Sequence, residues 1–137
     1  MVIDTDVVVA GFRSPTGASA AILQLARQGA CRIAVSNALL IEYEAVLTRP
    51  EHLKHGDRAE SDAQALLDVI ADLAEWVLID ILWRPQARDP DDDLVIDAAV
   101  NCGADAIVTF NRRDFGGAPE QFGIECLLPS EALEKVR

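Results

Sequence analysis

Residues 1–9 read Met-Val-Ile-Asp-Thr-Asp-Val-Val-Val, so that two carboxylates interrupt an apolar start. Val2–Asp4, with Val7–Val9 behind it, is the first of five short runs rich in valine and isoleucine. Each run is too short for a typical helix, and most end at a polar residue, which is the pattern of buried strands. The other four runs are Arg32–Val35, Trp76–Leu82, Ala106–Thr109 and Ile124–Leu128.

The segments between these runs predict helices. Gly29 suits a helix C-terminus, Ser36 suits an N-cap, and Asp89 followed by Pro90 suits a cap with a first-turn proline. Strands that alternate with helices need crossover connections, so we predict an α/β fold of three layers (α/β/α) with a mainly parallel central sheet of about five strands. The predicted helices are Thr16–Gln28, Asn37–Leu47 ahead of Pro50, the amphipathic Arg58–Glu75, Pro90–Cys102 closed by Gly103, and Pro129–Val136.

Length and composition indicate an ordinary globular protein. The chain has 137 residues, of which 50% are hydrophobic and 26% charged, and this suits one domain with its own core. Its three cysteines are scattered, so neither a disulfide framework nor a thiolate zinc site is indicated. No apolar run approaches the ~20 residues of a membrane span, and no secretory signal is visible. We therefore expect a single cytoplasmic domain over residues 1–137 that has no membrane partner.

The charge balance argues against generic nucleic-acid binding. The chain has 23 Asp and Glu against 12 Lys and Arg, for a net charge of −11. A surface of that sign repels phosphate backbones. Carboxylates that gather at one point can instead bind a metal ion, and a bound dication reverses the local field.

Polar residues come directly after three of the predicted strands. They are Asp4-Thr5-Asp6, Ser36-Asn37, and Thr109-Phe110-Asn111, which runs on to Asp114. In open α/β sheets, function gathers at the carboxyl ends of the strands, and Asp4 closes an apolar strand at that edge. Asp4 and Asp6 could equally form a turn or cap the next element of the chain, and the sequence alone leaves both interpretations open. The chain contains neither Gly-x-Gly-x-x-Gly nor Gly-x-x-x-x-Gly-Lys, so dinucleotide-binding and P-loop functions have no support.

The helix after Asp89 opens with three further acids, Asp91-Asp92-Asp93. Acids in a first turn interact favourably with the helix dipole and need no function. Periodicity separates them, because at ~100° per residue the apolar positions centre on the direction of Asp92. A carboxylate within a core-facing stripe is costly unless something compensates it, so we predict a functional role for Asp92. By the same count Asp93 lies to one side, and Asp97 with Asn101 faces solvent.

The helix Asn37–Leu47 contains two candidate acids. Glu42 and Glu44 flank its apolar stripe at similar angles on opposite sides, so periodicity does not choose between them. Beyond this helix, His52 and His55 lie in a polar stretch, where we expect a solvated loop rather than a metal site.

A fourth candidate acid comes after the Ala106–Thr109 strand. Asp114 stands directly after Arg112 and Arg113, and a polar loop with Phe115 tucked beneath it is the plain interpretation. The functional interpretation is a carboxylate at the same sheet edge with two arginines beside it to meet phosphate.

Taken together, these motifs resemble the PIN-domain family of metal-dependent ribonucleases, over nearly the whole chain. Val-Ile-Asp4-Thr5-Asp6 looks like that family's first-strand motif, in which Asn more often stands at the place of Asp6. Ser36 with Glu42 six positions later resembles the second motif, which favours Glu42 over Glu44. Asp89-Pro-Asp-Asp92-Asp93 resembles the third, and residues 107–115 resemble the fourth.

The resemblance implies that Asp4, Glu42, Asp92 and Asp114 bind Mg²⁺ or Mn²⁺ and carry catalysis. Hard oxygen ligands suit these ions, which could hold a scissile phosphate and activate a water. The residues expected to support this site are Thr5, Asp6, Ser36, Asp93, Thr109 and Asn111, and those expected to contact RNA are Arg112 and Arg113.

The same resemblance implies a biological role. Many members of the family are toxins of bacterial toxin–antitoxin pairs, and Arg49-Pro50 after the glutamate helix suits a subgroup of these toxins. We therefore expect an RNA substrate, a cognate antitoxin protein as a partner, and a homodimer.

Two other functions fit parts of the pattern. Asp4-x-Asp6-x-Val8 resembles the nucleophile motif of haloacid-dehalogenase-type phosphatases, with Asp4 as the nucleophile. That family needs a later lysine, and Lys54 sits in a polar segment. A catalytically degenerate PIN-like domain that binds RNA or a protein partner is the other alternative. The apolar segment Trp76–Trp83 could serve either as core or as an interface, and we expect core.

Overall fold

The structure is a computed structural model that describes residues 1–54, 59–80 and 90–136. Its centre is a sheet of five short parallel strands in the order β3-β2-β1-β4-β5. β1 lies in the middle, because Val2 pairs with Ala34 on one side and with Ile107 on the other. The strands are β1 (Val2–Ile3), β2 (Ala34–Val35), β3 (Glu75–Trp76), β4 (Ala106–Val108) and β5 (Glu125–Leu127).

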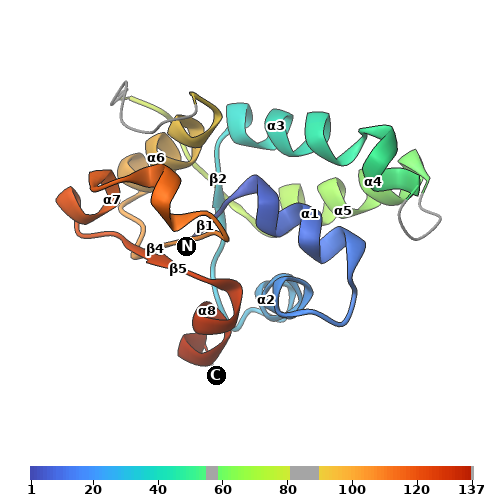
Figure 1. Cartoon of the computed structure of the whole chain (residues 1–137), viewed down its shortest axis with the longest axis horizontal. Helices are drawn as coiled ribbons and strands as arrows, with labels where there is room; N and C mark the ends of the chain where they lie inside the picture. Colours follow the sequence, from blue (N-terminus) through green and yellow to red (C-terminus); the bar gives the residue numbers. More distant parts are fainter. Residues whose placement is uncertain (55–58, 81–89, 137) are drawn as a thin grey trace.

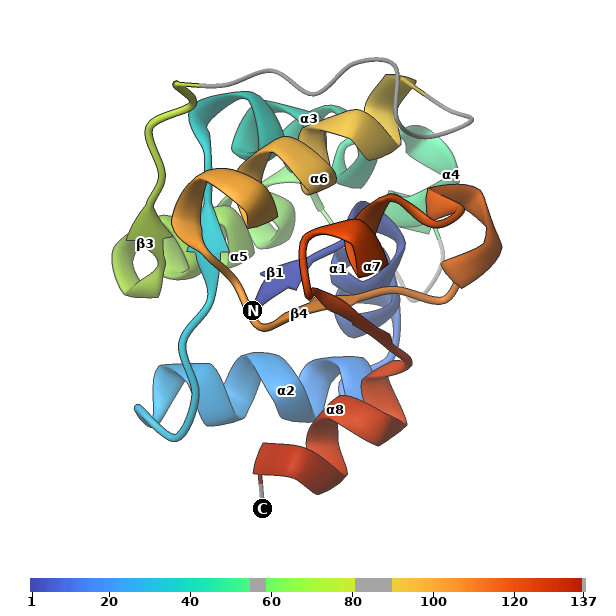
Figure 2. The same cartoon turned by 90° about the vertical axis from the view of Figure 1, so that its left-hand side faces the viewer.

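Helices flank this sheet, as the predicted α/β fold requires. Figure 2 shows α3 and α6 on one side of the strands and α2 and α8 on the other. Figure 1 shows α1 alongside α3, with α4 beyond the far end of α3. The helices are α1 (Thr5–Arg13), α2 (Ala18–Arg27), α3 (Asn37–Leu47), α4 (Pro50–Lys54), α5 (Glu60–Leu73), α6 (Pro90–Cys102), α7 (Ala118–Gln121) and α8 (Pro129–Val136), with a 3₁₀ turn η1 (Arg112–Phe115).

Local signals account for most of these boundaries. The Leu39 N–H donates to Ser36 Oγ at 3.1 Å, which confirms the predicted cap of α3. Gly103 has a φ of 66°, a left-handed conformation that glycine adopts without steric cost, and it closes α6 as predicted. Asp89, the predicted cap of α6, lies outside the described residues.

The prediction for Val7–Val9 was wrong. We expected these valines to continue the first apolar run, but they are buried residues of α1. Asp4 ends the strand and caps this helix, because its Oδ1 accepts a hydrogen bond from the Thr5 N–H at 2.7 Å. The chain therefore changes from strand to helix within one residue, and the valines pack into the core from a helix.

The prediction for the end of α6 was also wrong. Asp97 does not face solvent, since only 2% of its surface is exposed. The Asp80 N–H donates to Asn101 Oδ1 at 3.0 Å, and Asn101 Nδ2 donates to the Asp97 carbonyl at 2.8 Å. The chain after β3 therefore lies over the face of α6 that periodicity assigned to solvent, whereas Cys102, counted in the apolar stripe, is exposed.

The segment after α5 differs from prediction as well. α5 ends at Leu73, and β3 takes up Glu75 and Trp76 at the edge of the sheet. Trp76 is 51% exposed and Leu78 is 82% exposed. The prediction of core therefore fails for Trp76 and Leu78, which are exposed, but it holds in part for Val77, which packs against the hydrophobic core. Residues 81–83 lie outside the described residues.

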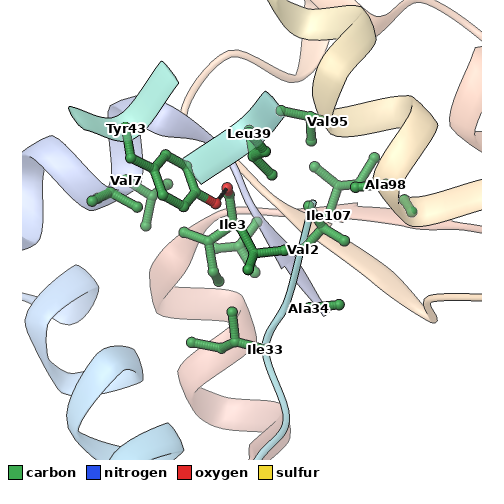
Figure 3. Close-up of a cluster of buried hydrophobic side chains, with 14 of the residues drawn as sticks. Val2, Ile3, Val7, Ile33, Ala34, Leu39, Tyr43, Val95, Ala98 and Ile107 are labelled. Carbon is green, nitrogen blue, oxygen red and sulfur yellow. Dashed lines mark hydrogen bonds between the residues drawn. The ribbon is translucent and has the colours of Figure 1, made fainter. Parts of the chain in front are cut away.

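The core fixes α3 against the central strand. Tyr43 is fully buried, and its hydroxyl donates a hydrogen bond to the Ile3 carbonyl (Figure 3). Burial among apolar side chains raises the pKa of Tyr43. Because Ile3 directly precedes Asp4, this contact holds α3 close to the end of β1.

Within the described part of the chain, no helix has the length and apolar character needed to cross a membrane.

Candidate functional site

A pocket of about 480 Å³ opens at the edge of the sheet where β1 and β4 end. Five acids line it, and they come from four separate parts of the chain: the start of α1, the middle of α3, the first turn of α6 and the turn η1. We call this group the acidic end of the pocket. Its members are Asp4, Asp6, Glu42, Asp92 and Asp114.

Asp4 is the most buried of these acids, with 6% of its surface exposed. Its Oδ2 accepts a hydrogen bond from the Thr109 hydroxyl at 2.7 Å, and Thr109 is itself fully buried after β4. The Asn111 N–H donates in turn to Thr109 Oγ1 at 2.9 Å. Asp4 therefore both caps α1 and lies in the pocket, so the two interpretations left open by the sequence are compatible.

Asp6 lies in the first turn of α1 and is held from the β4 side. Its Oδ2 accepts hydrogen bonds from the Phe110 N–H at 3.2 Å and from Asn111 Nδ2 at 2.8 Å. Its other oxygen, Oδ1, is buried and has no hydrogen-bond partner among the described residues. A buried carboxylate oxygen without a partner is costly, and a bound cation would compensate it.

The pKa values show that the acids act on one another. Burial raises the pKa of Asp6 to about 7, and the charges of Asp4 and Asp92 contribute in the same direction. Burial also raises the pKa of Asp4, with a contribution from the charge of Asp114, while hydrogen bonds from Thr109 and Thr5 lower it. Carboxylates far apart in sequence therefore share one electrostatic environment.

The structure separates the two glutamates of α3. Glu42 is half-buried and lines the pocket, whereas Glu44 is exposed and does not line it. The difference arises because Glu42 shares the pocket with side chains of α1, which packs against α3, whereas Glu44 does not. This placement agrees with the motif that favoured Glu42.

The acidic end gathers carboxylates without arranging them as a finished ligand set. Among the described residues, no three Asp, Glu, His or Cys side chains are placed to hold a metal ion. The donor types nevertheless fit a hard divalent cation, because carboxylate oxygens are the ligands that Mg²⁺ and Mn²⁺ prefer. The partnerless Asp6 Oδ1 fits the same kind of occupant.

The expected supporting residues fall into two groups. Thr5, Asp6 and Asn111 line the pocket. Thr109 does not line it but donates a hydrogen bond to Asp4, which does. Ser36 and Asp93 are buried and do not line it; Ser36 caps α3 instead.

The two arginines expected to contact RNA do not line this pocket. Arg112 forms an ion pair with Glu131 at 3.0 Å and lines a separate hollow beside β5. Arg113 is exposed in the turn η1.

Three cationic or potentially cationic side chains also line the pocket, and the sequence did not predict that they would share it with the acids. We call Arg13, Arg49 and His52 the basic end. The expectation of a solvated loop for His52 was wrong, because His52 lies in α4 with a side chain only 13% exposed. A helical signal in Pro50–Lys54, with a first-turn proline and Glu51 beside it, could have indicated this helix. His55 lies outside the described residues.

Comparison with known proteins now gives the family. A search of the curated proteins finds no match. Residues 1–113 match the model of the PIN domain, which covers most of the 137-residue chain and four of the five acids of the pocket, all but Asp114. The chain therefore belongs to the PIN-domain family, whose members are generally nucleases that use divalent metals.

Proposed function

We propose that this protein is a divalent-metal-dependent endoribonuclease that cleaves single-stranded or structured RNA, with Mg²⁺ or Mn²⁺ held by Asp4, Glu42, Asp92 and Asp114. The observation that carries the proposal is the convergence of these acids from four segments on one pocket. Burial, together with the charges of neighbouring acids, raises the pKa values of Asp4 and Asp6, and such carboxylates are costly to fold together. A dication held by these residues would offset that cost and would give the pocket an affinity for phosphate despite the net charge of −11.

The side chains around the acids have positioning roles in this proposal. Thr109 orients the carboxylate of Asp4 through its 2.7 Å hydrogen bond, and Asn111 orients Asp6 through its 2.8 Å hydrogen bond. Both contacts come from the chain that leaves β4, so they tie the ends of the two central strands together. A divalent ion bound at the acids supplies charge for the scissile phosphate and lowers the pKa of a water.

The structure supports this proposal over a haloacid-dehalogenase-type phosphatase. Such a phosphatase needs a lysine near its nucleophile, and the described residues that line this pocket contribute arginine and histidine but no lysine. Asp6 is also half-buried and held by two hydrogen bonds from residues 110 and 111, which leaves little freedom for an acid/base role on a phosphomonoester.

The test is cleavage of a fluorogenic single-stranded RNA by the purified protein with Mn²⁺ or Mg²⁺. We expect cleavage with metal, none in EDTA, and none by an Asp4→Asn/Asp92→Asn variant. A second readout is thermal stability: Mn²⁺ should raise the Tm of the wild type and leave the Tm of the variant unchanged. Equal Tm shifts in both proteins would contradict the proposed metal site.

A non-cleaving PIN domain that binds RNA or a protein is the second candidate. The observation in its favour is that no three acidic, His or Cys side chains among the described residues are placed to hold a metal. Binding of RNA without cleavage at any metal concentration would select this function over the nuclease.

We further propose that the protein is the cytoplasmic toxin of a toxin–antitoxin pair and acts as a homodimer. The support is the motif resemblance, including Arg49-Pro50 after the glutamate helix. Expression of the chain alone should arrest growth, and co-expression of a small neighbouring gene product should relieve the arrest. Normal growth with wild-type protein that cleaves RNA in vitro would contradict the toxin role without affecting the chemistry.

A further inference from the structure

The pocket is lined by acids and also by arginines, and the proposed metal site involves only the acids. Along α1, the residues after Asp6 that line the pocket are Val9 and Ala10, and then Arg13. The spacing of three or four residues keeps these side chains on one stripe. Arg13 is seven positions after Asp6, and this spacing corresponds to about 10 Å along a helix axis.

α3 repeats the same arrangement on the other side of the pocket. After Glu42, the pocket is lined by Val46 and then by Arg49, again at helical spacing. Arg49 comes just after the helix end, where its N–H donates to the Val46 carbonyl at 3.2 Å. The two packed helices therefore carry acids at one end of a shared hollow and arginines about 10 Å further on.

The arginines of the basic end differ from several other cations of the protein. Arg32, Arg112 and Lys135 each form an ion pair with a glutamate at 2.8 to 3.2 Å. Among the described residues, neither Arg13 nor Arg49 has an ion pair with a carboxylate, although the chain carries 23 acids. Their charges are thus available to an anion that enters the pocket.

The helix dipole explains only part of this placement. A cation in the last turn of a helix interacts favourably with the helix dipole, and this favours Arg13 at the end of α1. Arg27 in the last turn of α2 has the same advantage and does not line this pocket. The dipole therefore does not account for two helices bringing their arginines to the same hollow, with the half-buried His52 beside them.

We infer that the basic end binds a backbone phosphate of the RNA that lies within a few nucleotides of the scissile one. The inference rests on the proposed function, because it takes the acidic end as the place of the scissile phosphate. A separation of about 10 Å corresponds to about three stacked nucleotides, or fewer in an extended strand. Guanidinium groups suit phosphate oxygens. Phe110, which is 48% exposed in the same pocket, offers a surface on which an unpaired base stacks, and this favours a single-stranded substrate.

The test is binding of a fluorescein-labelled single-stranded RNA hexanucleotide in EDTA, measured by fluorescence anisotropy between 50 and 200 mM salt (about the range over which phosphate contacts show their salt dependence). For an Arg13→Gln/Arg49→Gln variant we expect a Kd at low salt about tenfold higher than that of the wild type. The slope of log Kd against log salt should flatten by about 0.7, the contribution of one neutralised phosphate on a single strand.

An Arg27→Gln/Arg32→Gln variant is the matched control. It also removes two positive charges, but both lie outside this pocket, and one of them is again at a helix C-terminus. It should keep the wild-type Kd within about twofold. Equal losses in the two variants, with matching Tm values, would overturn the inference, as would a wild-type protein that does not bind the hexanucleotide.

A kinetic readout separates this inference from the proposed function. With Mn²⁺, the Arg13→Gln/Arg49→Gln variant should raise KM about tenfold and leave kcat nearly unchanged, because the contact is made equally in the ground and transition states. If Asp4→Asn abolishes cleavage while the arginine variant binds and cleaves like the control, the phosphate subsite is wrong and the nuclease stands. If no protein cleaves RNA, the nuclease fails and the binding comparison still decides the subsite.

Discussion

Charged side chains are arranged differently at the two ends of the parallel strands. At the edge where the strands begin, Arg32 pairs with Glu75 at 3.2 Å and Lys135 pairs with Glu125 at 2.8 Å. At the edge where the strands end, Asp4 and Asp6 lie with other carboxylates, and burial and repulsion raise their pKa values. Among the described residues, opposite charges are paired where the strands begin, whereas like charges gather where the strands end.

This difference supports the proposed binding site at the end of the sheet where the strands end. Exposed ion pairs contribute about 0 to 1 kcal/mol and need no function. Buried like charges lower stability, and groups with such perturbed pKa values concentrate at functional sites. The contrast between the two edges therefore gives matched positions for experiment, in which the same change of charge should have very different results.

The largest effect is expected from Asp4→Asn, compared with Glu125→Gln at the opposite edge. Loss of Asp4 should reduce metal-dependent RNA cleavage by more than about a hundredfold, the upper range for groups that only orient a ligand. Glu125→Gln removes one negative charge from an exposed pair and should change the rate less than about twofold. The measurement is the initial rate on a fluorogenic single-stranded RNA with Mn²⁺. Similar losses in both variants would remove the distinction between the edges.

The next effect sharpens the comparison within one helix. Glu42→Gln should reduce cleavage about tenfold to a hundredfold and weaken the Tm increase caused by Mn²⁺, because Glu42 lines the acidic end. Glu44→Gln makes the same change two residues away on an exposed position and should leave both quantities unchanged. A variant pair with these results reversed would show that Glu44 is the functional acid.

A smaller effect concerns the apolar wall of the pocket. Phe110→Ala should weaken binding of the single-stranded hexanucleotide by about 1 kcal/mol, or about fivefold, through loss of base stacking. Because Phe110 carries no charge, the slope of log Kd against log salt should stay as in the wild type. A flatter slope would mean that the change has disturbed the basic end instead.

The smallest effect is a pH dependence of the metal-free protein. A carboxyl whose pKa is raised to about 7 holds its proton more tightly in the folded than in the unfolded state. Its stabilising contribution is therefore present below the ordinary pKa of 3.8 and is lost as the pH rises through about 7.

Because Asp6 is only partly buried, solvent screens much of this contribution. In EDTA, the Tm should fall by about 4 °C between pH 5 and pH 8, the shift caused by about 1 kcal/mol in a domain of this size. Asp6→Asn should reduce this fall and raise the Tm at pH 8. An unchanged or steeper fall in Asp6→Asn would contradict the role of Asp6.

Most of the fold was predictable because it depends on local patterns. Short Val- and Ile-rich runs predicted strands, and the Ser36 cap and Gly103 predicted helix ends that the structure contains. Asp4 was identifiable because it closes a buried strand at the edge where functional groups gather. Asp92 was identifiable because it interrupts an apolar stripe near a helix start, and it lines the pocket.

Other features were not predictable because they depend on which elements pack together. Periodicity treated Glu42 and Glu44 alike, and the tertiary structure distinguishes them, because Glu42 shares a pocket with side chains of α1 while Glu44 is exposed. It placed Asp97 in solvent, since it could not anticipate that the chain after β3 would cover that face of α6. It also assigned Val7–Val9 to a strand, although the Asp4 cap starts a helix there.

The sequence by itself determined where the strands lie, most of the longer helices, the Ser36 cap and the acids at the strand ends. These features depend on side chains within a few residues of one another. Only the tertiary structure decided that Arg13 and Arg49 share a pocket with those acids, and that Tyr43 fixes α3 beside Asp4. The physical reason is that Arg13 follows Asp6, and Arg49 follows Glu42, by seven positions. These arginines line one pocket only because α1 and α3 pack together in a particular register.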